Sequence, residues 1–276
     1  MSEDKPRRRR HVVGVRFRPE GPIAHFDPGP LRLAVGDRVV VETDRGPAIA
    51  TVATPRRPWL GSRRAPRIVK KADGRDRARE ERALALARTL EKTTHERLRR
   101  AALPLKLVSA DVALDCSRAT VFVTGEHRVD TRQLARDLGA VAKTRVDVRQ
   151  IGARDEARRT GGLGICGREL CCASWLTKFA PVSLKMAKIQ DLSPTPSKLA
   201  GQCGRLKCCL RYEFHTYQQL QRGLPPIGAE VQSVKGDGKV VGHRLLAQAV
   251  ILRRHEDGLH VEATLEDLVV PRGDDA

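Results

Sequence analysis

Six of the seven cysteines in this chain fall in two copies of one short pattern, GICGRELCC at 164–172 and GQCGRLKCC at 201–209. Both copies read Gly-x-Cys-Gly-Arg-x-x-Cys-Cys. The candidate metal ligands are therefore Cys166, Cys171, Cys172, Cys203, Cys208 and Cys209. Thiolates bind zinc, copper(I) and iron–sulfur clusters. In a chain without a secretory signal, such a density of cysteines favours a metal site, a cluster or redox chemistry over disulfides.

The spacing C-x4-C-C matches neither the C-x2-C pairs of zinc ribbons nor the C-x2-C-x2-C run of ferredoxins. Adjacent side chains point to opposite faces of a strand and diverge by about 100° on a helix. We therefore expect one cysteine of each pair to face a ligand and the other to be buried or to face a second site. A cubane cluster needs four thiolates. Six thiols can fill one such site with two to spare, or they combine with ligands from a partner protein.

The fixed glycines and arginines of the pattern have expected roles beside the thiols. Gly167 and Gly204 would let the backbone turn tightly after the first cysteine. Arg168 and Arg205 would place positive charge near the thiolates and offset the negative charge of a thiolate-ligated cluster. If both copies serve one site, Cys166 and Cys203 should converge.

Three kinds of function remain open from the residues alone. The first is a non-catalytic iron–sulfur protein, and the second is a zinc-stabilised RNA-binding module. The third is a thiol redox protein that uses Cys171–Cys172 or Cys208–Cys209, although the sequence has no C-x-x-C motif. No phosphate loop, nucleophile elbow or H-E-x-x-H motif is present, so we expect no enzyme activity.

Positive charge is concentrated in the first part of the chain. The net charge is +19, from 52 Lys and Arg against 33 Asp and Glu. The segment 1–102 carries 26 basic and 13 acidic residues. Such an excess predicts attraction to a polyanion, most often a nucleic acid. The segment 55–79 is especially basic, and its candidate nucleic-acid contacts are Arg56, Arg57, Trp59, Arg63, Arg64, Arg67, Lys70 and Lys71.

Patterns of apolar residues predict an α+β fold. Alternating runs in 11–54 predict a small β-barrel-like lobe, and 76–102 predicts a long helix. The segment 105–152 predicts a β-β-α-β unit, and 206–221 a further helix. The tail 227–270 returns to short β runs and predicts a second small barrel-like unit.

These elements divide into five expected segments. They are an N-terminal β lobe (1–54), a basic linker or extended loop (55–79), a helix with the central α+β unit (80–165), a Cys-rich cluster-binding region (166–221) and a C-terminal small β unit (222–276). The charged N-terminus is no secretory signal, and no run approaches the ~18 apolar residues of a membrane span. We therefore expect a cytoplasmic protein.

The stretch from VDTRQLARDLGAVAKTRVDVRQIG through both cysteine patterns closely resembles the bacterial RicT (YaaT) family, which carries the PSP-one C-terminal domain. The resemblance runs from about Val12 to Leu268 and is most specific across 129–213. It departs from the family at Ile165, where relatives usually show Pro, and in the segment DLSPTP at 191–196. No cysteine of the family pattern is missing.

This resemblance implies a cytoplasmic regulatory subunit with no catalysis of its own. It implies a complex with two small helical partners, RicA and RicF, that carries [4Fe–4S] clusters. It further implies that the complex works with the endoribonuclease RNase Y in mRNA maturation, and that it influences sporulation in spore formers. The family's cysteine positions correspond to the six cysteines of the doubled pattern here, and the resemblance leaves open which of them are ligands.

Overall fold

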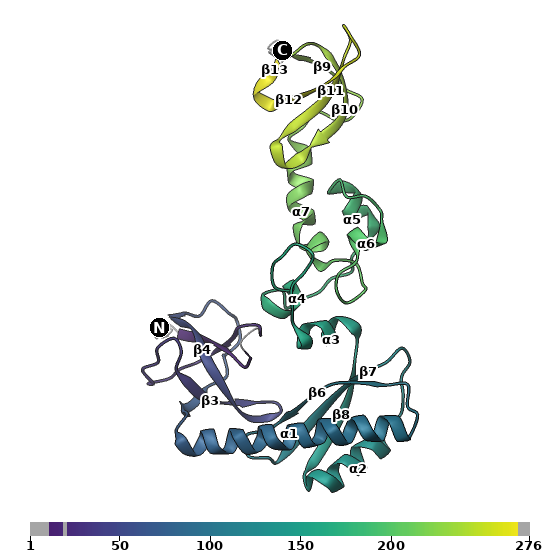
Figure 1. The fold of residues 1–276 in the computed structure, drawn as a ribbon. Helices are drawn as coiled ribbons and strands as arrows, with labels where there is room; N and C mark the ends of the chain where they lie inside the picture. Colours follow the sequence, from purple (N-terminus) through teal and green to yellow (C-terminus); the bar gives the residue numbers. More distant parts are fainter. Residues whose placement is uncertain (1–10, 19–20, 270–276) are drawn as a thin grey trace, which may run out of the picture. The chain divides into compact units, whose positions relative to one another are not determined.

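A computed structural model describes residues 11–18 and 21–269 (Figure 1). The first ten residues, which include the charged N-terminal run, lie outside the described residues. The chain divides into two compact units, Met1–Lys178 and Phe179–Ala276. Each unit is described below by itself.

The first unit begins with a closed β lobe, as the sequence predicts. Its five strands are β1 (His11–Arg16), β2 (Ala24–Phe26), β3 (Arg38–Thr43), β4 (Gly46–Pro58) and β5 (Ile68–Lys71), in the order β2-β1-β4-β3-β5. The two edge strands meet, because Asp27 donates to the Pro66 carbonyl at 2.7 Å and accepts from Ile68 at 2.9 Å. Valines from β1, β3 and β4 fill the interior of this barrel.

The basic segment 55–79 differs from the linker that its composition predicts. Its first residues continue β4 as far as Pro58, its middle includes β5, and its end starts a helix at Gly74. Ile68 is only 6% exposed, so one apolar residue fixes β5 against the barrel core. Strand β5 pairs with β3, and this long-range pairing outweighs the local prolines and arginines.

Helix α1 (Gly74–Arg100) begins at a capping box formed by two aspartates. The N–H of Asp76 donates to Asp73 at 2.9 Å, and the N–H of Asp73 donates back to Asp76 at 3.1 Å. Asp76 is 1% exposed and also pairs with Lys70 at 2.6 Å. Because acidic groups sit at the start and arginines occupy the last turn, the ends of α1 complement the helix dipole.

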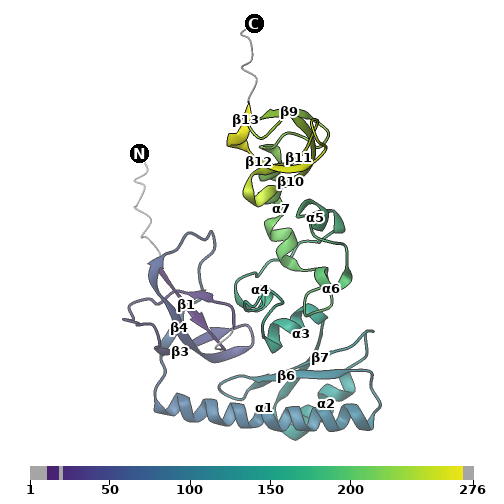
Figure 2. The same ribbon diagram turned by 45° about the horizontal axis from the view of Figure 1, so that its top comes forward.

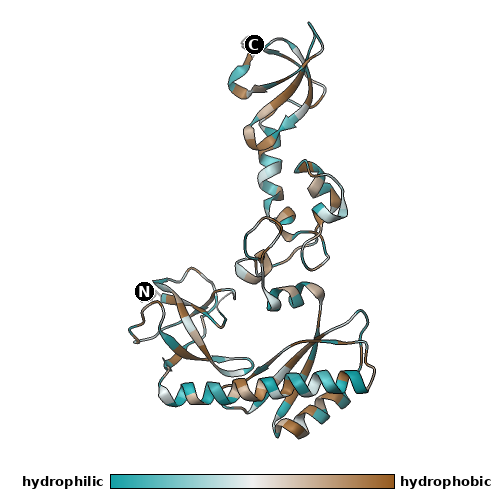
Figure 3. Ribbon diagram, viewed as in Figure 1, coloured by the Kyte–Doolittle hydropathy of each residue, from teal (hydrophilic) through white to brown (hydrophobic). Residues whose placement is uncertain are grey.

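The central unit is a three-stranded sheet with two helices on one face (Figure 2). Strands β6 (Lys106–Val112) and β7 (Arg118–Thr124) are antiparallel, and β8 (Arg145–Ile151) runs parallel to β7 after helix α2 (Arg132–Ala142). The core contains apolar side chains from all these elements, with Leu90, Val121 and Leu138 fully buried. Helix α1 is largely hydrophilic, with apolar segments along it (Figure 3).

Two short helices end the first unit. Helix α3 (Ala153–Thr160) stops at Gly161, and helix α4 (Cys171–Ser174) follows the first cysteine pattern. The two helices pack together.

The second unit joins a small helical cluster to a β unit. Helices α5 (Leu184–Ile189) and α6 (Pro196–Leu199) pack with α7 (Cys208–Arg222) around the buried Ala187, Leu199 and Leu210. Five strands then form a sheet in the order β12-β11-β10-β9-β13. Their bounds are β9 (Glu230–Ser233), β10 (Gly238–Arg244), β11 (Ala249–Arg254), β12 (His260–Thr264) and β13 (Leu268–Val269), with 3₁₀ turns η1 (Leu245–Ala247) and η2 (Leu265–Asp267).

These elements confirm the predicted α+β class and the predicted order of β lobe, long helix, β-β-α-β unit and C-terminal β unit. Within the described residues, no helix is both long enough and apolar enough to span a bilayer.

The start of α1 predicts an acid-sensitive contribution to stability. The hydrogen bond from the Lys70 side chain holds the pKa of Asp73 at about 2, below the usual 3.8. Since the folded state binds this proton less tightly, the carboxylate stabilises the fold above pH 3.8, and that stability is lost as pH falls through about 2. In urea denaturation, we expect Asp73→Asn to lower the free energy of unfolding at about pH 5. At about pH 2 its free energy of unfolding should approach that of wild type.

Asp44→Asn is the matched control, because Asp44 is 80% exposed and lies 3.9 Å from its partner Arg45. It should give no pH-dependent difference. If the free energy of unfolding of D73N stayed below that of wild type by the same amount down to the lowest pH, the charge of Asp73 would not be the source of the stability.

Helix α2 packs its buried side chains against the three-stranded sheet. Removing one of them should leave a cavity and lower the free energy of unfolding strongly. Leu138 is 0% exposed, so Leu138→Ala should lower the free energy of unfolding by about 2–5 kcal/mol in chemical denaturation. Val141→Ala on the same helix removes a side chain that is 45% exposed and should cost much less. Equal costs for the two variants would contradict this packing.

Candidate metal centre in two cysteine turns

The first cysteine pattern folds as a tight turn that leads into a helix. The N–H of Gly167 donates to the Gly164 carbonyl at 2.9 Å, and the N–H of Gly164 donates to the Arg168 carbonyl at 2.8 Å. A short antiparallel bridge joins Leu163 to Glu169. Cys166 therefore stands in the turn itself and is exposed.

The second pattern repeats this geometry bond for bond in the other unit. The N–H of Gly204 donates to Gly201 at 2.9 Å, and the N–H of Gly201 donates to Arg205 at 2.8 Å. The antiparallel bridge recurs between Ala200 and Leu206. The repeated letters of the sequence are thus one structural motif used twice, which we call the cysteine turn, at 163–172 and at 200–209.

The fixed glycines are required by the backbone, as the sequence predicts. Gly167 has a φ of +76° and Gly204 a φ of +71°. Both are in the left-handed region, where a side chain is strained. A Cβ at either position would meet no atom within 4 Å, so the need for glycine is conformational and not steric.

The arginines after these glycines contribute their main chain. The carbonyls of Arg168 and Arg205 accept the hydrogen bond that closes each turn, while both side chains are exposed. Their expected electrostatic effect on the thiolates stays a prediction.

Both cysteine pairs open a helix. Cys171 and Cys172 are the first two residues of α4, and Cys208 and Cys209 are the first two of α7. On a helix the two side chains diverge, and Cys172 is 7% exposed while Cys171 is half-buried. In the second turn both cysteines are half-buried.

The helix predicted over 206–221 is confirmed as α7, whereas the sequence did not indicate α4. Neither helix is preceded by a usual N-cap residue. Leu170 precedes α4 and Lys207 precedes α7, and neither side chain caps its helix. The turn itself holds them instead, because Leu170 donates to Gly162 at 3.0 Å and Lys207 donates to Leu199 at 2.9 Å. The positive end of the 15-residue α7 lies at its cysteine pair.

The thiols suit a soft metal by their chemistry and exposure. None of the cysteines forms a disulfide within the described residues, and five of the six in the turns are at least partly exposed. No three Cys, His, Asp or Glu side chains gather closely enough to hold an ion in the part of the chain that the structure describes. The first turn belongs to the first unit and the second turn to the second unit. The predicted convergence of Cys166 and Cys203 therefore stays a prediction.

The seventh cysteine lies apart from both motifs. Cys116 occupies the tight turn between β6 and β7 with a φ of +56°, and its carbonyl accepts from Thr144 at 2.8 Å.

The candidate nucleic-acid residues fall into two groups. Lys70 pairs with Asp73 and Asp76, and Lys71 pairs with Asp37 at 2.8 Å. These two lysines stabilise the start of α1 and the barrel. The arginines of the segment are exposed at its surface, namely Arg56, Arg57, Arg63, Arg64 and Arg67.

Trp59 is held by its own loop. Its indole N–H donates to the Arg63 carbonyl at 2.7 Å, and its ring lies 5.6 Å from that of His25. A Cβ at Gly61 would lie 2.2 Å from the indole, so this glycine makes room for the ring. Arg57 also contacts His25. Trp59, a candidate nucleic-acid contact by sequence, is thus packed against its own loop and His25.

Two family models and one curated protein match this chain. The PSP1 C-terminal conserved region matches residues 66–151, and the third domain of PSP1-like proteins matches 181–224, which includes the second cysteine turn. The stage 0 sporulation protein YaaT of Bacillus subtilis (strain 168) is 37% identical over 269 residues, which cover 94% of this chain and 95% of that protein. No solved structure gives a match.

The positive φ angles predict that alanine disrupts each turn. Gly167→Ala and Gly204→Ala should each lower the free energy of unfolding by about 1–2 kcal/mol, because a Cβ is strained in the left-handed region. Chemical denaturation of the metal-free protein measures this cost.

Gly74→Ala is the matched control, since Gly74 starts α1 without a positive φ and has no neighbour within 4 Å of an added Cβ. It should leave stability unchanged or slightly raised. A turn variant that behaves like this control would show that the left-handed turn is not required.

Proposed function

This chain belongs to the PSP1 C-terminal family that includes Bacillus subtilis YaaT, and on that premise we propose that it is a non-catalytic, cytoplasmic regulatory subunit that binds an iron–sulfur cluster. The cluster is a [4Fe–4S] cluster held through the cysteine turns. The subunit acts with RicA-like and RicF-like partners in a complex that supports mRNA processing by RNase Y. YaaT is named for stage 0 of sporulation, and we propose a regulatory role of the same kind here.

The observation that carries this proposal is the bond-for-bond repetition of the cysteine turn. A motif that repeats its glycine φ angles, its bridge and its helix start at two places puts three cysteines at the same backbone positions twice. A single chemical role for the cysteine turn explains why it occurs twice. Metal ligation by soft thiolates is the role that fits its three cysteines.

The number of thiols determines what each turn can do alone. One turn offers three cysteines, whereas a cubane takes four thiolates. A turn must therefore combine with the other turn or with a ligand from a partner. Such a cluster can store an electron or respond to oxidants when it is bound. The residues of this chain would supply the thiolates and the positive charge around them.

A zinc-stabilised RNA-binding module is the second candidate. The cysteine in a tight turn closed by a left-handed glycine would suit a tetrahedral zinc site as well. Zinc would make the fold sensitive to chelators, without absorption in the visible range.

Metal analysis of anaerobically purified protein distinguishes these functions. We expect a brown protein with bound iron and sulfide, alone or after purification with the partner proteins. Colourless protein with stoichiometric zinc, even with the partners present, would replace the first proposal with the second.

Single cysteine variants test which thiols matter. Cys166→Ser and Cys203→Ser should each lower bound iron at least about twofold, because a four-thiolate site that loses a ligand is weakened. Cys116→Ser is the control, since its cysteine lies outside both turns, and its iron content should equal that of wild type. Equal iron in all three variants would show that the turns are not the site.

A further inference from the structure

The three-stranded sheet has one apolar face and one charged face. On β7, Ala119, Val121 and Val123 point into the core beneath α1 and α2. The alternate residues Arg118, Thr120 and Phe122 therefore point to the other side, which we call the open face. Its centre is covered, since Thr120 is 2% and Phe122 6% exposed, and the exposed arginines lie around that centre. Strand β8 repeats the pattern, with Val146 in the core and its alternate residues Arg145, Asp147 and Arg149 on the open face.

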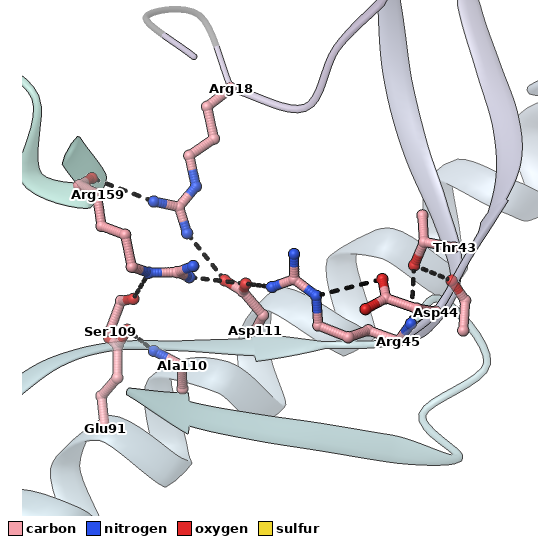
Figure 4. A network of polar contacts seen from close by, with 10 residues as sticks. Arg18, Thr43, Asp44, Arg45, Glu91, Ser109, Ala110, Asp111 and Arg159 are labelled. Carbon is pink, nitrogen blue, oxygen red and sulfur yellow. Dashed lines mark hydrogen bonds and ion pairs between the residues drawn. The ribbon is translucent and has the colours of Figure 1, made fainter. Parts of the chain in front are cut away.

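Three arginines from separate segments converge on one carboxylate at this face (Figure 4). Asp111 of β6 accepts from Arg18 at 2.8 Å, from Arg45 at 3.0 Å and from Arg159 at 2.7 Å. Arg18 follows β1, Arg45 lies in the β3–β4 hairpin, and Arg159 lies in the last turn of α3. One carboxylate offsets one of these three charges.

Arg159 is held firmly in this cluster. Its guanidinium lies 3.5 Å from the centre of the Phe122 ring, and it also donates to Ser109 at 2.9 Å. Its side chain is 16% exposed, and burial lowers its pKa, with Arg18 and Arg45 acting in the same direction. An anion that approaches this cluster would therefore be attracted to its uncompensated positive charge.

The rest of the open face adds to the positive charge. The arginines of the face are Arg18, Arg45, Arg118, Arg145, Arg149 and Arg159, and Lys106 adds a further cation. Its carboxylates are Asp44, Asp111, Asp147 and Glu156, the last of which lies 3.8 Å from Lys106. Arg149 lies beside Phe122 in the register of β7 and β8 and is exposed. Arg145 lies 3.7 Å from Asp147. Guanidinium donors therefore exceed carboxylate acceptors across the whole face.

We propose that the open face binds the phosphate backbone of single-stranded RNA. Planar guanidinium groups match phosphate oxygens in pairs, and arginines spread over several strands suit a chain of phosphates better than one small anion. The choice of RNA as the polyanion rests on the proposed role in mRNA processing. Phe122 is covered by Arg159, so contacts are to the backbone, with little sequence preference and steep salt dependence.

This assignment differs from the basic loop that composition suggests. There the two lysines are paired with aspartates, and Trp59 is packed against its own loop. On the open face, arginines outnumber the carboxylates. The two surfaces can be separated by mutation because they share no arginine.

The test measures binding of the full chain to a fluorescent single-stranded RNA of mixed sequence at several salt concentrations. The double variant Arg145→Gln with Arg149→Gln removes two exposed charges from the open face and leaves the Asp111 cluster intact. We expect about tenfold weaker binding, and a slope of log affinity against log salt that is smaller by about 1.4, for two lost phosphate contacts.

Two matched variants each remove the same charge elsewhere. Arg82→Gln with Arg88→Gln changes exposed residues on α1, which covers the opposite face of the sheet, and should bind within about twofold of wild type. Arg63→Gln with Arg64→Gln changes the basic loop and should also remain close to wild type. Equal losses in all three variants, or a loss confined to the loop variant, would overturn the proposal.

Competition decides the class of partner. Polyglutamate at equal charge should displace the RNA poorly, and equal displacement would point to an acidic protein and overturn the proposal. Iron is measured on the same samples, so that failures can be told apart. Iron-free wild type that binds RNA through the open face would contradict the cluster proposal alone, whereas iron-loaded protein whose RNA binding ignores Arg145 and Arg149 would contradict this one.

Discussion

The carboxylate of Asp111 connects the parts of the first unit. Its two oxygens accept from arginines of the barrel strand end, the β3–β4 hairpin and helix α3. Without this carboxylate three guanidinium groups would face one another around a half-buried site, and the repulsion would act on all three segments at once. Helix α3 packs on β6 and is followed by the first cysteine turn, so the place where that turn begins depends on the same charge.

The two cysteine turns reach the same local geometry in different surroundings. The first follows α3 and ends in the four-residue α4, whereas the second starts the 15-residue α7. What they share is short-range: a left-handed glycine, a main-chain bond between the residues on either side of the cysteine, and a helix that starts at the cysteine pair. A motif specified within ten residues can be used wherever the fold offers an anchor for its two ends.

Local patterns in the sequence predicted the elements that depend on neighbouring residues. The strands of the barrel, the long helix and the β-β-α-β unit follow from apolar alternation and helical periodicity, and Gly167 and Gly204 follow from the need for a tight turn. Strand β5 was missed, because its place is set by pairing with β3 and by one buried isoleucine inside an arginine-rich segment. The Asp111 cluster was missed for a similar reason, since its arginines come from positions 18, 45 and 159 and meet only after folding.

Helix α7 has one end at a pair of thiols and the other in a β core. Cys208 and Cys209 form its first turn, while Tyr217 and Leu220 pack against the C-terminal strands. The helix is about 22 Å long, and its main-chain hydrogen bonds form a cooperative series. Ligation at the first turn would hold that end against fraying. The rates at which the amide hydrogens of α7 exchange with solvent would then record the state of the thiols, even at residues that never touch a metal.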